Sequence, residues 1–415
     1  MSERSDVLEK IFNNFLDGPR IFKNREVLRS DYIPSVLPHR EEQIKLIGSI
    51  LAPSLRGSRS SNVFIYGQTG SGKTAVIKYV LERLLRKSEE IGTKLDTCYV
   101  NCRITGTDYR VLASLCASLG VSIPFTGLAT SEVFDRFKGD LETQKTLMIA
   151  ILDEIDSLLG RYGDTVLYDL TRINEELKYS KLAIIGISND LRFKELLDPR
   201  VLSSLSEEEV VFRPYSATEL TDILLDRASI SFINGALSDG ALRLAAALAA
   251  AEHGDARRAL DLLRVAGEIA ERDGTPVINE KNIREAEKKI EHDRISVFLR
   301  SLPLHSKIIV CCAYLMTKMN VSSLITGDLY EVYQELCGKS GIGVLTQRRV
   351  SGLINELDTN GVLNCRIVSR GRYGRTKKIR LAIPVTVVRD VFSDDLWTVQ
   401  LLNYAPKSLK NKTRH

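Results

Sequence analysis

The first half of the chain alternates short apolar segments with longer segments of helical hydrophobic period. Four apolar segments have the length of buried strands: NVFIYG at 62–67, TCYVN at 97–101, TLMIAILD at 146–153 and KLAIIGIS at 181–188. Nearly continuous apolar strands separated by helices favour a parallel sheet covered on both faces. EEVVFRPY at 208–215 is expected to form a fifth strand. The sequence therefore predicts an α/β fold.

Between residues 216 and 292 the pattern becomes wholly helical. Its four helical segments each start near Ser, Asp or Asn, which cap helix N-termini, and several end at Gly. A small helical domain is predicted here, which would act as a lid in a nucleotide-binding protein.

The C-terminal part has a third pattern. Three helical segments, at 306–319, 327–338 and 346–361, precede two strand-like segments at 362–369 and 376–383. Three helices followed by a β-hairpin is the order of a winged helix-turn-helix. The predicted domains are 1–215, a nucleotide-binding α/β domain, 216–293, the helical lid, and 294–415, a winged-helix domain.

Composition narrows the class of protein. The 415 residues are 44% hydrophobic and 27% charged, which is typical of a folded chain with more than one domain. No apolar run approaches the roughly 18 residues of a membrane span, and the first ten residues are polar. We expect a cytoplasmic, nucleoid-associated protein without a membrane partner. The seven cysteines lack a paired CxxC framework, so buried reduced thiols are expected.

The net charge of +5 is unevenly distributed. Residues 359–389 hold eight Lys or Arg and no acid, so the rest of the chain has a net charge of 50 − 53 = −3. A local basic segment is typical of a docking surface for nucleic acid, although a solvated loop would have the same composition.

YGQTGSGKTAV at 66–76 fits the phosphate-binding pattern GxxxxGK[ST], directly after a predicted strand and at the start of a helix. Its glycines let backbone N–H groups turn toward the β-phosphate, at the positive end of the helix. Lys73 is expected to reach the β- and γ-phosphates of ATP or ADP, and Thr74 to bind Mg²⁺. The predicted nucleotide contacts in this loop are Gly67, Gln68, Thr69, Gly70, Ser71, Gly72, Lys73, Thr74, Ala75 and Val76.

Two further strands end in polar residues that suit hydrolysis. In ILDEID, Asp153 would support Mg²⁺ and Glu154 would polarise an attacking water. After the strand at 181–188, the Asn189 amide is expected to hold that water or to sense the γ-phosphate, although taken alone Asn189 would be a turn residue.

HGDARRAL at 253–260 places cations where a helix disfavours them. Gly254 can end one helix and Asp255 can cap the next, which puts Arg257 and Arg258 in a first turn. Arg257 is therefore predicted to meet the phosphates from the lid, with a surface ion pair as the alternative. The predicted catalytic residues are Lys73, Glu154, Asn189 and Arg257.

With these motifs in this order, the chain resembles the AAA+ ATPases. Further segments make it similar to the archaeal origin-recognition initiators, single-chain relatives of the eukaryotic origin recognition complex and cell-division-cycle loader. These segments are IFKNREVLRSDYIPSVLPHREEQI at 21–44, LLDPRVLSSL at 196–205, RPYSATELTDILLDRA at 213–228, HGDARRALDLLR and the winged helix.

The resemblance implies several roles. Tyr215 and Arg227 would help to form the nucleotide pocket, with Arg257 as its second sensor, and the segment from Tyr32 to Arg40 would pack near the adenine. A helical insertion within 107–140 would touch DNA. Arg200 occupies the region where AAA+ proteins keep an arginine finger for a neighbouring subunit.

In a helix-turn-helix, the first residues of the last helix meet base edges. Gln347, Arg348 and Arg349 lie there, ahead of an apolar face of Val350, Leu353, Ile354 and Leu357. The Gly-rich tip of the hairpin adds cations that suit phosphates or a minor groove. The predicted DNA contacts of the hairpin are Arg370, Arg372, Tyr373, Arg375, Lys377 and Lys378.

The preferred hypothesis is an ATP-controlled replication initiator, a weak ATPase that binds origin duplex DNA and helps to recruit or regulate the replicative helicase, together with paralogous initiators. A protein remodeller would leave the basic hairpin without a purpose. An ATP-responsive transcription regulator remains an alternative that the motifs do not separate from an initiator.

Overall fold

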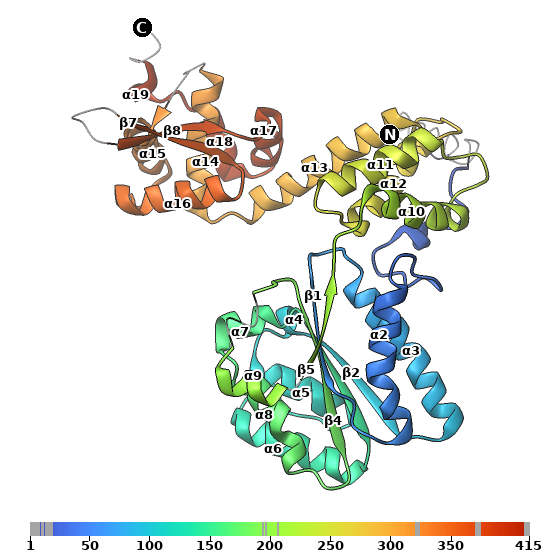
Figure 1. The fold of residues 1–415 in the computed structure, drawn as a ribbon. Coiled ribbons are helices and arrows are strands. Elements are labelled where there is room, and N and C mark those ends of the chain that lie inside the picture. Colours follow the sequence, from blue (N-terminus) through green and yellow to red (C-terminus); the bar gives the residue numbers. More distant parts are fainter. Residues whose placement is uncertain are drawn as a thin grey trace. The chain divides into compact units, whose positions relative to one another are not determined.

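The computed structural model describes residues 20–192, 197–205, 207–319, 324–369 and 375–410, together with residues 9, 12 and 195. The chain divides into two units, Met1–Ala286 and Glu287–His415, and each is described by itself (Figure 1).

A five-stranded parallel sheet is the centre of the first unit, with the strand order β2-β3-β4-β1-β5. Its strands are β1 Asn62–Gly67, β2 Leu95–Asn101, β3 Leu147–Asp153, β4 Lys181–Ser188 and β5 Glu207–Phe212. The predicted parallel sheet is confirmed. The fifth strand ends at Phe212, before the predicted residue 215, because Pro214 has no N–H to donate to a ladder.

Helices cover both faces of this sheet (Figure 1). α2 Glu41–Leu51 and α3 Lys73–Ile91 pack with Val63 and Ile65 of β1 on one face. Phe64 and Tyr66 point to the other face, because side chains alternate along a strand. The helices whose buried residues pack there are α5 Asp108–Ser118, α6 Thr130–Gln144 and α8 Thr165–Arg172. Shorter elements connect these pieces: η1 Arg25–Leu28, η2 Ala52–Arg56, α4 Cys102–Thr105, α7 Asp156–Tyr162, η3 Ile173–Glu175 and α9 Pro199–Leu205.

The lid follows β5 and begins each helix with a side-chain cap. Ser216 and Glu219 form a capping box for α10 Ala217–Ser231, and Ser238 caps α11 Asp239–Ala251. Asp255 caps α12 Ala256–Arg272, as its sequence predicted. The next helix, α13 Glu280–Ser301, contains the division between the two units.

The second unit is a winged helix. Its first elements are α14 Leu304–Lys318, β6 Leu324–Ile325, α15 Thr326–Ser340, α16 Gln347–Thr359, β7 Leu363–Ser369 and β8 Arg375–Leu381. The three strands form an antiparallel sheet in the order β6-β8-β7. The helices that follow are α17 Val385–Ser393, α18 Leu396–Leu402 and α19 Lys407–Lys410, which the hydrophobic pattern did not predict. α17 buries Val387, Val388, Val391 and Phe392 in the core of this unit.

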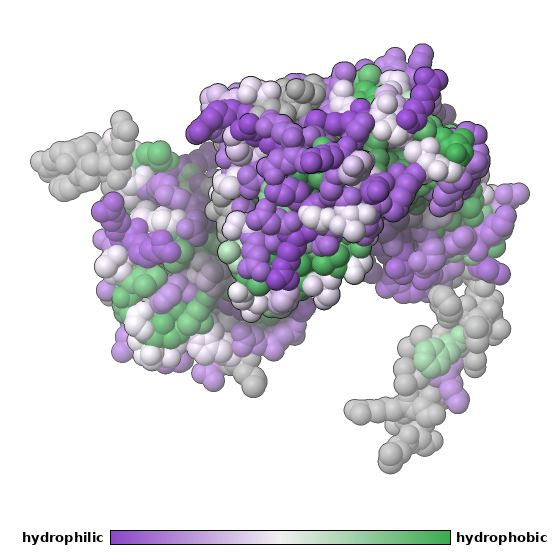
Figure 2. Space-filling view, turned by 90° about the horizontal axis from the view of Figure 1, so that it is seen from below, coloured by the Kyte–Doolittle hydropathy of each residue, from purple (hydrophilic) through white to green (hydrophobic). Residues whose placement is uncertain are grey.

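All seven cysteines are free thiols, six of them buried and Cys365 half-buried, as expected. Among the described residues, no helix combines the length and the apolar composition of a membrane span. Hydrophilic residues cover much of the face in Figure 2, where hydrophobic residues occur in separate groups.

Candidate functional site

A pocket of about 660 Å³ in the first unit collects the residues that follow the carboxyl ends of its strands. The phosphate-binding loop follows β1, Asp153 ends β3, and Asn189 follows β4. Arg257 from α12 lines the same pocket from the lid. Residues that are far apart in sequence therefore meet where parallel α/β sheets bind ligands.

Lys73 is the buried cation of the phosphate-binding loop. Its Nζ donates to the carbonyl oxygens of Gly67 (2.7 Å) and Gln68 (2.9 Å) and to Oδ1 of Asn189 (2.8 Å). Burial lowers the pKa of Lys73 to about 8, an effect that the nearby Asp153 carboxylate partly opposes. The three acceptors of the Lys73 ammonium are neutral oxygens, so a bound phosphate would supply the negative charge that they lack.

The other predicted loop residues divide by position. Thr69, Gly70, Gly72, Thr74 and Ala75 line the pocket together with Lys73. The Ser71 hydroxyl donates to the Gln68 carbonyl at 2.8 Å, which closes the turn of the loop. The Val76 side chain lies in the hydrophobic core instead of the pocket, and its backbone N–H donates to the Gly72 carbonyl.

Thr74 and Asp153 form the oxygen-rich corner of the pocket. Thr74 Oγ1 donates to Asp153 Oδ2 at 3.0 Å, and the Tyr99 hydroxyl donates to the same oxygen at 2.5 Å. Hydroxyl and carboxylate oxygens are ligands that suit Mg²⁺, which commonly takes one or two carboxylates beside substrate phosphates. The Thr74–Asp153 pair therefore fits the predicted magnesium site.

Sequence reasoning missed Tyr99. Burial raises the pKa of its hydroxyl, so the group acts as a neutral donor to Asp153. No local sequence signal marks it, because its place beside Asp153 depends on the pairing of Asn101 of β2 with Asp153 of β3, and Tyr99 lies two residues before Asn101 on the same side of the sheet.

Glu154 follows Asp153 with a left-handed backbone, φ 53°. Its Oε2 lies 3.5 Å from an Nη of Arg103, a cation that is 74% exposed. An acid held at the end of β3 can polarise a water in the pocket.

The lid touches the phosphate-binding loop directly. The Ala256 N–H donates to the Gly70 carbonyl at 3.2 Å. Gly70 has φ +76°, and a Cβ there would lie 1.8 Å from Oδ1 of Asp255, so only glycine fits. Asp255 accepts from the N–H groups of Arg257 and Arg258, and the exposed Arg257, the second residue of α12, lines the pocket.

The opposite wall comes from the segment at 29–38 and from α10. Arg227 is buried, donates to the Val27 carbonyl at 3.2 Å and lies over the Tyr32 ring at 4.8 Å. Burial lowers its pKa. Ile33, Pro34 and Ile223 line this side, which gives the apolar surface that a base requires.

Tyr215 lines the pocket beneath the phosphate-binding loop and is buried. The guanidinium of Arg40 lies 3.7 Å from the centre of its ring.

Arg200 is at the start of α9, where it pairs with Asp198 at 3.2 Å and is exposed.

The candidate nucleic-acid surface of the second unit begins at α16. Thr346 caps this helix, and Gln347, Arg348 and Arg349 are exposed in its first turn. The predicted apolar face is confirmed, because Val350, Leu353, Ile354 and Leu357 are buried.

The β7–β8 hairpin separates two predicted contacts. Lys377 hydrogen-bonds to Asn355 of α16, whereas Lys378 projects from the opposite face, because neighbouring residues alternate along β8. Arg370, Arg372 and Tyr373 lie outside the described residues, and of Arg375 only the backbone, at the start of β8, is described.

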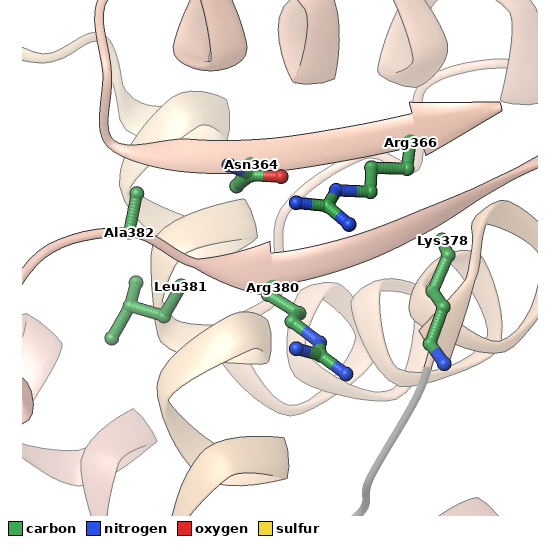
Figure 3. Close-up of a pocket in the computed structure, with 6 residues that line it drawn as sticks. All are labelled: Asn364, Arg366, Lys378, Arg380, Leu381 and Ala382. Atoms are coloured by element: carbon green, nitrogen blue, oxygen red, sulfur yellow. The ribbon is translucent and has the colours of Figure 1, made fainter.

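Lys378 belongs to a cationic hollow of about 350 Å³ on the hairpin (Figure 3). Asn364 and Arg366 of β7 lie opposite Arg380 and Lys378 of β8. No carboxylate is among the residues that line it. In the sequence, Arg366 and Arg380 counted only toward the charge of the basic segment. Arg366 is paired with Lys378, and Arg380 lies two residues beyond Lys378, so all three side chains lie on one face of the hairpin.

A parallel sheet with a phosphate-binding loop, a helical lid and a winged helix defines the AAA+ class of P-loop proteins with an added winged-helix domain. Family models match in the same order: an AAA domain at 56–192, a Cdc6 AAA+ ATPase-type lid domain at 221–288 and the CDC6 C terminal winged helix domain at 298–391. The chain belongs to the family of ORC1-type DNA replication proteins, as its sequence motifs predicted.

The relatives match over nearly the whole chain. An ORC1-type DNA replication protein of Thermococcus onnurineus is 51% identical over 94% of this chain and 95% of its own length. That of Pyrococcus furiosus is 50% identical over 98% of both. The structure of the Aeropyrum pernix ORC1 protein in complex with DNA is 46% identical, with a TM-score of 0.83 over 92% of this chain and 99% of that one.

Proposed function

We propose that this chain is an ATP-dependent replication initiator that binds duplex origin DNA and helps to recruit or regulate the replicative helicase. Its partners would include paralogous initiators, and it would act at the nucleoid. The observation that carries the proposal is the pocket in which Lys73, Asp153, Glu154 and Asn189 of the sheet meet Arg257 of the lid. A nucleotide bound in this pocket would contact residues of both the sheet and the lid, which gives a direct way for its state to act on the lid.

The nucleotide would be ATP or ADP with Mg²⁺. Lys73 and the backbone of the loop would hold the β- and γ-phosphates, Thr74 and Asp153 the magnesium, and the wall that contains Tyr32 and Arg227 the adenosine. Mg²⁺ would neutralise phosphate charge, and Arg257 would add a positive charge from the lid.

Hydrolysis would be slow and would serve as a switch. Glu154 would polarise the attacking water, with Asn189 beside it, while Oε2 of the Glu154 carboxylate is shared with the ion pair to Arg103. A slow step suits a protein that must remain in its ATP state on DNA until a partner arrives.

DNA would contact the second unit through α16 and the hairpin. The exposed Gln347, Arg348 and Arg349 suit base edges, and Arg366, Lys378 and Arg380 suit phosphates. The solved structure of the similar A. pernix ORC1 protein in complex with DNA supports DNA as the partner.

Genome-wide footprinting of the chain in its own cells tests the role. We expect occupancy concentrated at sites where replication starts, and loss of those sites when Lys73 is replaced by Ala. Occupancy spread over promoters, with replication starts left bare, would favour the transcription regulator instead. An Arg389→Ala variant is the control, because Arg389 lies in the basic segment but is paired with Asp390 on α17.

A further inference from the structure

Arg40 is a fully buried cation without a carboxylate among the groups to which it donates. It precedes α2, and its guanidinium donates to three backbone carbonyls. Nε donates to Ser71 at 2.9 Å, Nη1 to His39 at 2.9 Å and Nη2 to Arg213 at 2.8 Å. Burial lowers the pKa of Arg40, because the guanidinium has lost water and its three acceptors are neutral carbonyls.

The three carbonyls belong to parts of the first unit that must act together. Ser71 is in the phosphate-binding loop, and Arg213 lies between β5 and the lid. The ring of Tyr215, two residues further on, stacks on the guanidinium at 3.7 Å. Tyr215 N–H donates to the Gly254 carbonyl at 3.3 Å, next to the cap of α12.

The bond to Ser71 has a consequence for phosphate binding. The Ser71–Gly72 peptide is trans, so its C=O and N–H point in opposite directions. With the Ser71 carbonyl fixed on Arg40, the Gly72 N–H is directed away from Arg40. Gly72 lines the pocket, and among the described residues no acceptor is bound to its N–H.

Gly72 is itself fitted to this arrangement. It has φ +92°, and a Cβ would lie 2.7 Å from the Tyr215 hydroxyl and 3.7 Å from Arg40 Nε. The loop, Arg40 and Tyr215 are thus packed as one layer behind the phosphate position.

We propose that Arg40 is a positioning residue for the phosphates: it aims the Gly72 N–H into the pocket and joins the phosphate-binding loop to the Arg213–Tyr215 hinge of the lid. The inference rests on the proposed nucleotide binding and adds its link to the lid. When a β-phosphate binds in the loop, Arg40 then transmits the change to the hinge.

The test compares ADP with AMP, because only ADP has the β-phosphate that the loop surrounds. Affinities are measured by calorimetry or by competition in the full chain carrying Arg40→Gln. We expect ADP affinity to fall about tenfold or more, since a charge-assisted hydrogen bond is lost, and AMP affinity to stay within about twofold. Arg40→Lys keeps the positive charge but loses the guanidinium that donates to three carbonyls, so its ADP affinity should lie between those of the wild type and Arg40→Gln. This variant serves for the test if Arg40→Gln fails to fold.

Ile47→Ala is the matched control for lost stability. Ile47 is fully buried on α2 and packs in the core instead of on the loop. This variant should melt at a lower temperature and keep the wild-type ratio of ADP to AMP affinity.

Hydrogen exchange gives a second readout. Saturating ADP should slow exchange of the amides at 215–216 and 254–256 in the wild type, and slow it clearly less in Arg40→Gln. Unchanged ADP affinity, an equal loss of ADP and AMP affinity, or equal protection at the hinge would each overturn the inference. If the wild type binds no ADP, both the proposed function and the inference about Arg40 are wrong. If the wild type binds ADP and the Arg40 variants bind it equally well, only the inference about Arg40 is wrong.

Discussion

Lys73 determines how the nucleotide pocket responds to pH. Buried among two carbonyls and an amide, it retains only part of the stabilisation that water gives an ammonium group, which is why its pKa falls to about 8. A bound phosphate would restore that stabilisation and raise the pKa again. Binding and protonation of this one residue are therefore linked.

The affinity for ADP should fall as the pH rises above 8. Below pH 8 the free protein already has a charged Lys73, so this group contributes no pH dependence. Above it, binding must recover a proton, and the affinity should drop by about tenfold per pH unit until the pKa of the complex is reached. Titration calorimetry between pH 7 and 9.5 measures this. Lys73→Arg, whose charge is constant, should lack the slope; an affinity of the wild type that stays flat to pH 9.5 would contradict it.

Glu154→Gln should separate ATP binding from hydrolysis. The amide cannot polarise water, so hydrolysis is expected to fall by about a hundredfold or more, while ATP affinity changes little. Single-turnover hydrolysis and nucleotide titration measure the two. Glu132→Gln, which removes an exposed acid of α6 paired with Arg136, is the control. Equal hydrolysis by Glu154→Gln and wild type would show that another residue acts as the base.

Residues differ in how far sequence can identify them. Asp255 was predicted as a cap because its partners are two and three residues away. Arg40 had no comparable signal, because it donates to backbone carbonyls that any residue has, one of them 173 residues along the chain. Tyr99 likewise depends on the register of β2 with β3, which only the folded sheet provides.

Elements were predictable where hydrophobic period and local caps agree. β1 and β4 have the predicted bounds, since uninterrupted apolar runs between turn residues leave few alternatives. β6 has only two residues, too few for a period. α17 begins VTVV, whose β-branched residues favour a strand, and packing in the core of the second unit decides for a helix.

Two caps of the lid should separate helix stability from nucleotide binding. Asp255→Ala removes the cap of α12 and Ser238→Ala that of α11, and each should cost about 1 kcal/mol in the opening of its helix, measured by hydrogen exchange. Only Asp255→Ala should weaken ADP binding as well, because α12 carries Arg257 and its Ala256 contacts Gly70. Equal ADP affinities of the two variants would mean that the lid contact does not support the loop.

At the scale of the whole molecule, two units with separate cores divide the charge between them. The core of the second unit is formed by residues from Leu299 to Leu402, and the sheet cores contain none of these. The basic segment at 359–389 lies wholly in the second unit, whereas the rest of the chain has a net charge of −3.

The salt dependence of duplex binding should show how many cations of this basic segment contact phosphates. If about five cations contact phosphates, log K should fall against log salt with a slope near −4 to −5. Replacing Arg366 and Arg380 together by Ala should flatten that slope by about 2, as fluorescence anisotropy at several salt concentrations can measure. Arg389→Ala, paired with Asp390, should leave it nearly unchanged. A slope that the double substitution does not alter would place the DNA surface elsewhere.

The burial of the cysteines has a practical consequence. With six thiols enclosed and Cys365 only half-accessible, the chain needs little removal of native cysteines before a spectroscopic probe is attached. One new thiol on α12 and another on α17 would accept spin labels, and pulsed electron resonance could then follow the separation of the two units as nucleotide and duplex are added.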